Sequence, residues 1–207
     1  MRSPCAPLVA ALVALALAAC DAATLTPPPD PVKIGLQAGD LPASLQRCPA
    51  SGDVDAYLRD VQGRNRDAHD ELAAAWTDLQ RRGATGAAVA VYAEQPAACG
   101  ARLGTGAGPN VSSVVVRFKD EKAAASAFRR GMLGFSTPSE DEEIDDMTLG
   151  PATGLGRNAW VLERSVQGRS LIVALWERHE VTVLLMAADA DPLHAKRALA
   201  AIDGRMP

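Results

Sequence analysis

The chain has 207 residues, a formal net charge of −4, and 48% hydrophobic but only 4% aromatic residues. This length is typical of one domain with a substantial buried core. A nucleic-acid-binding surface needs clustered Lys and Arg side chains, whereas the basic residues here come in small groups such as Arg81-Arg82 and Arg129-Arg130. The composition therefore argues against a nucleic-acid partner.

The N-terminus has the layout of a secretory signal. Arg2 precedes a twelve-residue apolar run over residues 8–19, which ends in small residues just before Cys20. Because a transmembrane helix needs about 20 apolar residues, this run is expected to direct export and then to be removed. An ordinary signal peptide cut near Ala22 or Ala23 is the alternative.

The run Leu17-Ala18-Ala19-Cys20 resembles the lipobox of bacterial lipoproteins. The resemblance implies that the Cys20 thiol receives a diacylglyceryl group, that residues 1–19 are cleaved as a signal peptide, and that the new amino terminus is acylated, for example with palmitate. Two or three acyl chains hold a domain at a membrane, whereas one binds only marginally. We therefore expect a lipid-anchored protein on the extracytoplasmic side of the cell membrane. Asp21 resembles an inner-membrane retention signal of two-membrane bacteria.

The segment after the lipobox is rich in proline, which predicts extended chain. Pro27, Pro28, Pro29 and Pro31 disfavour both a helix and a central strand. Residues 20–33 are therefore expected to form a stalk, and residues 34–207 a single globular domain.

Two cysteines, Cys48 and Cys99, are left for the mature domain once Cys5 leaves with the signal and Cys20 carries lipid. Export places them in an oxidising compartment, where a structural disulfide persists. Closing a loop of roughly 50 residues would stabilise the fold by about 4 kcal/mol. Two buried free thiols, or a reactive pair that lacks Cys-x-x-Cys spacing, are the alternatives.

Hydrophobic periodicity predicts the elements of the first half of the domain. Apolar residues at helical spacing indicate amphipathic helices at about 53–61 and 67–82, the second of which ends at Gly83. Strands are expected at 87–93 and 111–119. Asp120 then caps a helix that runs to about Met132.

The second half predicts three strands and a final helix. The strands, at about 158–166, 170–178 and 181–188, are joined by short turns and should form an antiparallel meander whose middle strand is covered on both faces. Asp191 and Pro192 begin the helix, which ends near Gly204. The order of elements predicts an α+β fold, a largely antiparallel sheet packed by helices.

The same order supports a weaker resemblance over the last hundred residues. The strand 114–120 before an Ala-rich helix, then Gly154-Leu155-Gly156, a hairpin and a helix, resembles sensor-type, PsbP-like or Mog1-like domains of extracytoplasmic lipoproteins. It brings no catalytic or ligand motif, so it implies only the fold class.

No metal or nucleophile motif stands out. His69, His179 and His194 lack the spacing of metal ligands. The serines show neither a Gly-x-Ser-x-Gly elbow nor a Ser-x-x-Lys pair, so residues such as Ser51 and Ser136 are read as loop or cap positions. We assign no catalytic, cofactor or metal residue.

Three further patterns have a structural and a functional reading. The glycine-rich run 104–108 precedes a strand and is read as a turn near Cys99, since a phosphate loop must open a helix. The acidic run 140–146 is read as a solvated loop, with calcium or a basic partner as the alternative. Tryptophans are expected in the core, with a groove walled by indole rings as the alternative: Trp76, Trp160 and Trp176.

The sequence therefore favours a membrane-tethered binding or sensing module that contacts a small ligand, an envelope component or a protein partner. A hydrolase or transferase whose site residues are dispersed in the sequence is one alternative. A purely structural envelope protein is the other.

Overall fold

The computed structural model describes residues 28–139, 142 and 144–207. The expected signal peptide, the lipobox with Cys20, and Glu140, Asp141 and Glu143 of the acidic run lie outside these residues. The described chain folds into helices and an antiparallel sheet, so the α+β class expected from the sequence is confirmed.

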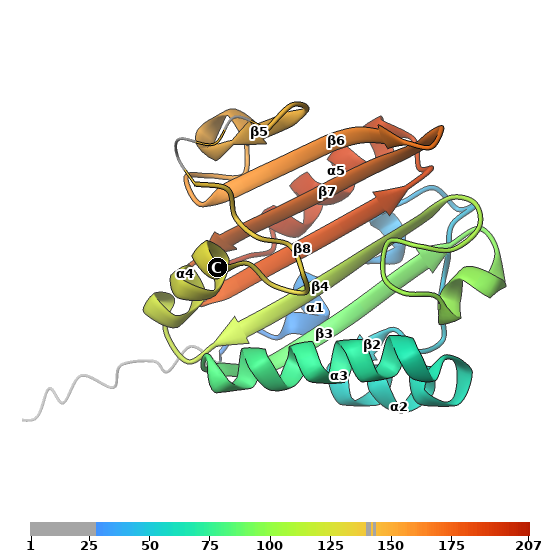
Figure 1. Ribbon diagram of the computed structural model, residues 1–207, viewed down its shortest axis with the longest axis horizontal. Coiled ribbons are helices and arrows are strands. Elements are labelled where there is room, and N and C mark those ends of the chain that lie inside the picture. The colour runs from blue at the N-terminus through green and yellow to red at the C-terminus, as the bar shows by residue number, and fades with distance from the viewer. Residues whose placement is uncertain (1–27, 140–141, 143) are drawn as a thin grey trace, which may run out of the picture.

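Eight strands form the sheet (Figure 1). The long strands follow the order β3-β4-β8-β7-β6, and each neighbouring pair is antiparallel. Short strands complete the edges, with β1 and β2 beside β3 and with β5 beside β6. The strands are β1 (Gln46–Arg47), β2 (Gly52–Asp53), β3 (Ala84–Ala93), β4 (Asn110–Phe118), β5 (Met147–Leu149), β6 (Ala159–Val166), β7 (Arg169–Arg178) and β8 (Val181–Ala188).

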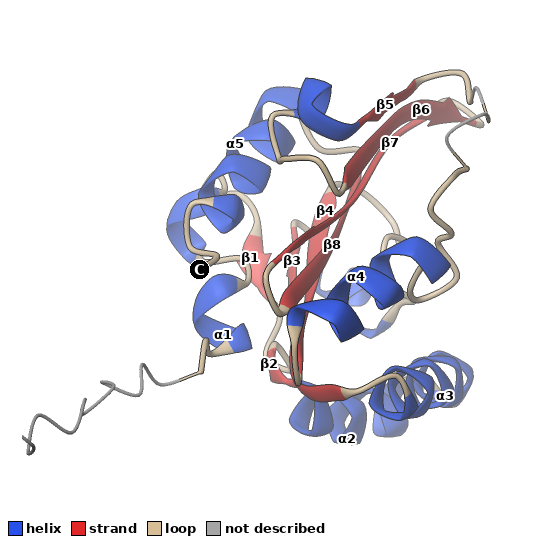
Figure 2. Ribbon diagram, turned by 90° about the vertical axis from the view of Figure 1, so that its left-hand side faces the viewer, coloured by secondary structure: helices blue, strands red, loops and turns tan. Residues whose placement is uncertain are grey.

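Helices cover both faces of this sheet (Figure 2). Three of them, α2, α3 and α4, lie on one face, and α1 and α5 lie on the other. The helices are α1 (Pro31–Ile34), α2 (Val54–Arg64), α3 (Arg66–Arg81), α4 (Glu121–Arg130) and α5 (Pro192–Asp203), with short 3-10 helices η1 (Ala38–Asp40), η2 (Pro96–Gly100) and η3 (Gly150–Thr153).

The middle of the sheet is buried on both faces. All eight residues of β8 are buried. Leu184 and Met186 pack in the cluster beneath α2, α3 and α4, whereas Val183 and Leu185 pack in the cluster beneath α1 and α5. The same alternation holds in β7, as expected from the sequence. Two separate cores therefore share one sheet.

The meander and the last helix form as predicted. β6, β7 and β8 pair in sequence, and His179 occupies the β7–β8 turn with φ 51°. The Asp191 side chain accepts the Leu193 N–H at 2.7 Å, and Pro192 opens α5. Some boundaries differ, since α2 runs to Arg64 rather than to about residue 61 and β3 begins at Ala84 rather than at residue 87. In addition, α4 ends at Arg130 rather than near Met132, because Gly131 turns the chain with φ 82°.

The globular domain begins earlier than the sequence predicts. Extended chain was expected through residue 33, but α1 starts at Pro31. Proline suits the first position of a helix, because the N–H that it lacks would have no partner within the helix there. Arg205 near the C-terminus holds this helix, since its guanidinium donates to the Ile34 and Gly35 carbonyls and pairs with Asp40 at 2.7 Å. Residues 31–34 therefore belong to the domain and not to a stalk.

The structure joins Cys48 to Cys99, the pair expected from the sequence, with their Cα atoms 5.4 Å apart. Cys48 follows β1, and its N–H donates to the Val91 carbonyl at 2.8 Å. Cys99 lies in η2, within the connection from β3 to β4. The bond therefore fixes this connection to one edge of the sheet.

No helix in the described part of the chain is long and apolar enough to cross a bilayer.

Removing the disulfide is expected to destabilise the domain. The double variant Cys48→Ala with Cys99→Ala should lower the free energy of unfolding by about 4 kcal/mol, because the bond closes a loop with a sequence separation of 51 residues. Urea denaturation followed by tryptophan fluorescence measures this change. Reduced wild-type protein is the control and should match the double variant; an unchanged unfolding midpoint would contradict the prediction.

Candidate functional site

A groove runs along α3 on the face of the sheet that α2, α3 and α4 cover. It has two adjoining parts, with volumes of about 440 and 280 Å³. Both parts are lined by Ala75 of α3 and by Leu133, Gly134 and Phe135 of the turn that follows α4. Small-molecule sites are usually about 300–1,000 Å³, so the groove has the size of a ligand site.

The larger part, here called the apolar compartment, lies between α2, α3 and the connection from β3 to β4. Its floor includes Met186 of β8, and its walls are mostly apolar. The principal lining residues are Tyr57, Val61, Leu72, Leu103, Phe135 and Met186.

Small side chains on α3 leave this space open. Ala68, Leu72 and Ala75 follow the helical spacing of the inward face of α3 and line the apolar compartment. Ala75 is only half-buried, although its position in the apolar stripe would place it in a core. Leucine or phenylalanine at these alanine positions would fill the space. Alanine in the inward stripe of α3 is therefore the signal of the groove in the sequence.

The smaller part, here called the polar compartment, lies between the C-terminal ends of α3 and α4. It is lined by Asp78 of α3, by Arg82 just after α3, and by Arg130 of α4. Arg82 pairs with Asp78, and its Nη1 donates to the Gly131 carbonyl at 3.0 Å. Arg82 therefore ties the end of α3 to the turn after α4.

The turn over residues 131–136 forms a shared wall and has an unusual backbone. Met132 and Phe135 bond to each other's backbone at 2.9 and 3.0 Å, and the two residues between them, Leu133 and Gly134, have φ of 54° and 84°. Both central residues are left-handed, which is the type I′ pattern. A leucine rarely adopts this conformation, and such outliers gather at binding sites.

The opposite wall is tied to α3 by an ion pair. Arg102 donates to both carboxylate oxygens of Glu71, from Nε at 2.6 Å and from Nη2 at 2.7 Å. This bond lowers the pKa of Glu71 and raises the pKa of Arg102. Because Arg102 comes shortly after Cys99, the disulfide and the ion pair together fix this wall.

Tyr57 of α2 lines the apolar compartment and is buried. Burial, assisted by the nearby Asp60 carboxylate, raises the pKa of Tyr57 to about 12. The group is therefore a neutral hydroxyl at physiological pH, able to donate or accept one hydrogen bond.

The structure places the three histidines on separate elements. His69 contacts Asp70 and His179 contacts Glu121, each through Nδ1, at 2.8 and 2.7 Å, while His194 lies on α5 across the sheet. Among residues 28–139, 142 and 144–207 there is no group of three or more His, Cys, Asp or Glu side chains that could hold a metal ion. Of the acidic run, Glu142, Asp145 and Asp146 are described.

The groove differs from the one that the tryptophans suggested. Trp76, Trp160 and Trp176 are all buried, as expected, and none of them lines either compartment. Trp160 touches the groove only through Phe135, which lines both compartments. The ring centroids of Trp160 and Phe135 are 6.4 Å apart. The glycine-rich run forms a turn, as predicted, with Gly104, Gly106 and Gly108 at positive φ.

No protein-family model and no curated protein sequence matches this chain. Among solved structures, the extracellular domain of PknH from Mycobacterium tuberculosis is similar, with 13% identity and a TM-score of 0.35. The match covers 59% of this chain and 64% of that one, so the chain spans less than two thirds of that domain. At this TM-score the likeness supports no conclusion about function, and the resemblance to lipoprotein sensor domains stays a prediction.

The 131–136 turn should depend on Gly131. A Cβ atom at Gly131 would lie 2.1 Å from the Phe135 carbonyl oxygen, and φ there is left-handed. Gly131→Ala is therefore expected to lower the free energy of unfolding by about 1–3 kcal/mol, measured by urea denaturation. The matched control is Gly63→Ala in α2, where a Cβ meets nothing within 4 Å and where alanine adds up to about 1 kcal/mol. Equal stability of the two variants would disprove the requirement.

Proposed function

We propose that this chain is a lipid-anchored extracytoplasmic protein that binds a small, largely apolar ligand in the groove along α3. The groove is the single observation that carries the binding role. The lipobox residues ending in Cys20 support the anchor. The proposal makes the protein a binding or sensing module rather than an enzyme, with the membrane as one partner and the ligand as the other.

The geometry of the groove suits binding. Its larger compartment is concave, mostly apolar and about 440 Å³, which are the properties of a site that shelters an apolar ligand from water. The principal charged groups at its rim, Glu71 and Arg102, already satisfy each other. Such a pair supports a wall and is poorly placed to exchange protons with a substrate.

The anchor would hold this groove close to a bilayer. Eight Cα-to-Cα steps separate Cys20 from Pro28, where the described chain begins. At a maximum of about 3.5 Å per residue, they reach no more than about 28 Å. A ligand of the groove would therefore be met at, or a short distance from, the membrane surface.

The anchor is tested by the variant Cys20→Ser. It is expected to move the protein from the membrane fraction to the soluble extracytoplasmic fraction, because the acyl chains have no other attachment point. Immunoblotting of fractions measures the shift, and intact-mass spectrometry of the wild type should show the added lipid. The control Cys5→Ser should leave the distribution unchanged. A wild-type chain that starts at Met1 without modification contradicts the anchor.

Ligand binding is tested by filling the groove. Ala75→Trp places an indole where the two compartments meet, so it should weaken binding of the apolar fluorescent dye Nile red at least about tenfold, which corresponds to roughly 1.4 kcal/mol. The control is Ala74→Trp, one position earlier on α3. Ala74 is exposed and lines neither compartment.

Both variants should keep the wild-type unfolding midpoint, which separates a blocked groove from a damaged fold. Equal dye affinity in both variants would show that the dye binds elsewhere and would remove the support for the binding role.

A further inference from the structure

We propose that the ligand of the groove is an anionic amphiphile, whose apolar body fills the apolar compartment and whose acid group lies against Arg82 and Arg130 in the polar compartment. This inference rests on the proposed function and adds the chemical class of the ligand. It depends on three features of the groove, namely its charge, its length and the order of its two parts.

The first feature is the positive charge of the polar compartment. Arg82 and Arg130 line it together with one carboxylate, that of Asp78. Arg81 also pairs with Asp78, at 3.1 Å, and does not line the compartment. One carboxylate is thus shared between two guanidinium groups, and Arg130 adds a further positive charge. In a chain of net charge −4, composition does not explain this local excess of positive charge.

Arg82 is held in a fixed position for binding an acid group. Its Nη1 contacts the Gly131 carbonyl and its Nη2 contacts Asp78. A guanidinium has five N–H donors in a planar fork that matches the geometry of carboxylate and phosphate. A side chain that is already ordered loses little entropy when a ligand binds.

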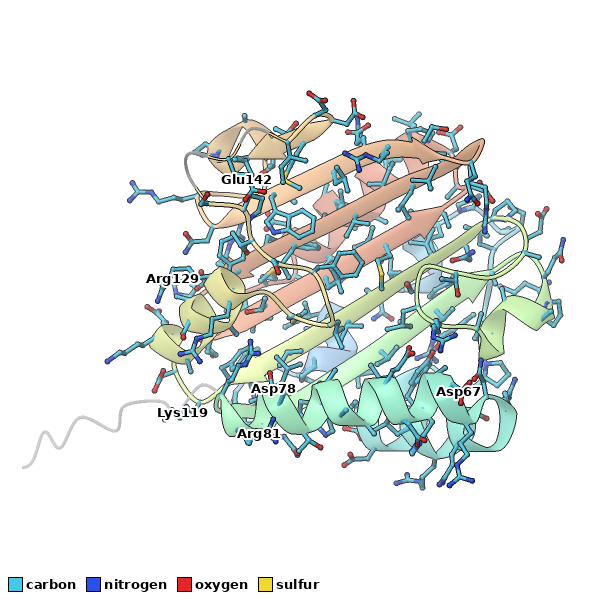
Figure 3. The ribbon with its side chains drawn as sticks, in the orientation of Figure 1. Asp67, Asp78, Arg81, Lys119, Arg129 and Glu142 are labelled. Atoms are coloured by element: carbon cyan, nitrogen blue, oxygen red, sulfur yellow. A yellow bond between two sulfur atoms is a disulfide. The ribbon has the colours of Figure 1, made fainter. Side chains whose placement is uncertain are left out.

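Helix ends alone do not account for these arginines. Arginine in the last turn of a helix stabilises the negative end of the helix dipole, and Arg81, Arg82, Arg129 and Arg130 all occupy such positions. Only Arg82 and Arg130 of these four line the groove. Figure 3 shows Arg129 at the outer side of α4, away from α3. The polar compartment is thus lined by two of these four arginines, one from the end of each helix.

The second and third features are length and order. Ala68 lines the apolar compartment and Arg82 the polar one. At 1.5 Å per residue, the 14 residues between these positions on α3 span about 21 Å. One leaflet of a bilayer holds about 15 Å of hydrocarbon, half of its roughly 30 Å core. Under this proposal an extended alkyl chain lies along this span of α3, with its acid group at the end that carries the arginines.

The test compares ligands that share a tail and differ in the head group. Dodecanoate, dodecyl phosphate, dodecanol and dodecylammonium compete with Nile red on the full domain, below the concentrations at which they form micelles. The wild type should bind an acid at least about tenfold more tightly than dodecanol, and dodecylammonium most weakly, since only the acids bring a negative charge to the guanidinium groups. Whichever of dodecanoate and dodecyl phosphate binds more tightly indicates whether the acid group of the ligand is a carboxylate or a phosphate.

Arg130→Gln should abolish most of the acid preference and leave the affinity for dodecanol unchanged, while the matched variant Arg129→Gln should behave as the wild type. Equal losses in both variants, or equal binding of acid and alcohol by the wild type, would overturn this inference. If the wild type bound acid and alcohol equally and Ala75→Trp still blocked this binding, the proposed function would remain intact. If no amphiphile and no dye bound to the groove, the proposed function itself would fail.

Discussion

The rest of the structure depends on a sheet whose middle strands are apolar on both faces. Every residue of β8 is buried, and its alternate side chains enter two clusters on opposite faces. Because apolar area left in water costs about 25 cal/mol per Å², both faces must be covered. On one face, α1 and α5 do so. On the other, α2, α3 and α4 leave a strip beside α3, with Met186 of β8 at its floor, and this strip is the groove.

The groove keeps its shape because each wall is tied by a different kind of bond. The Cys48–Cys99 disulfide and the Glu71–Arg102 ion pair hold the connection from β3 to β4, and Arg82 holds the turn after α4 through the Gly131 carbonyl. A groove that is already formed requires little ordering of loops when a ligand binds, which leaves more of the gross interaction energy as affinity. The left-handed Leu133 in the same turn is the local strain that these bonds maintain.

Local periodicity was enough to predict most elements, but it could not place the groove. The meander, the Asp191 cap and the disulfide follow from spacing, turn chemistry and compartment, all of which are readable in the sequence. α1 was missed because four residues are too few to show a helical period, and because contacts distant in the sequence hold it, such as that of Arg205, 171 residues away from Ile34. The groove depends on which elements become neighbours in space. Its local trace is Ala68 and Ala75 in the inward stripe of α3, and alanine fits a tightly packed core equally well.

The two compartments also have a fixed order relative to the proposed anchor. Pro28, at the start of the described chain, lies beside Lys119 in one shallow hollow, and the Lys119 N–H donates to the carbonyl of Gly83, the residue after Arg82. The arginine end of the groove is therefore the end from which the chain leaves toward Cys20. The apolar compartment, with Met186 at its floor, lies farther along α3 from this end. The order of the compartments along α3 thus puts the arginines between the start of the described chain and the apolar compartment.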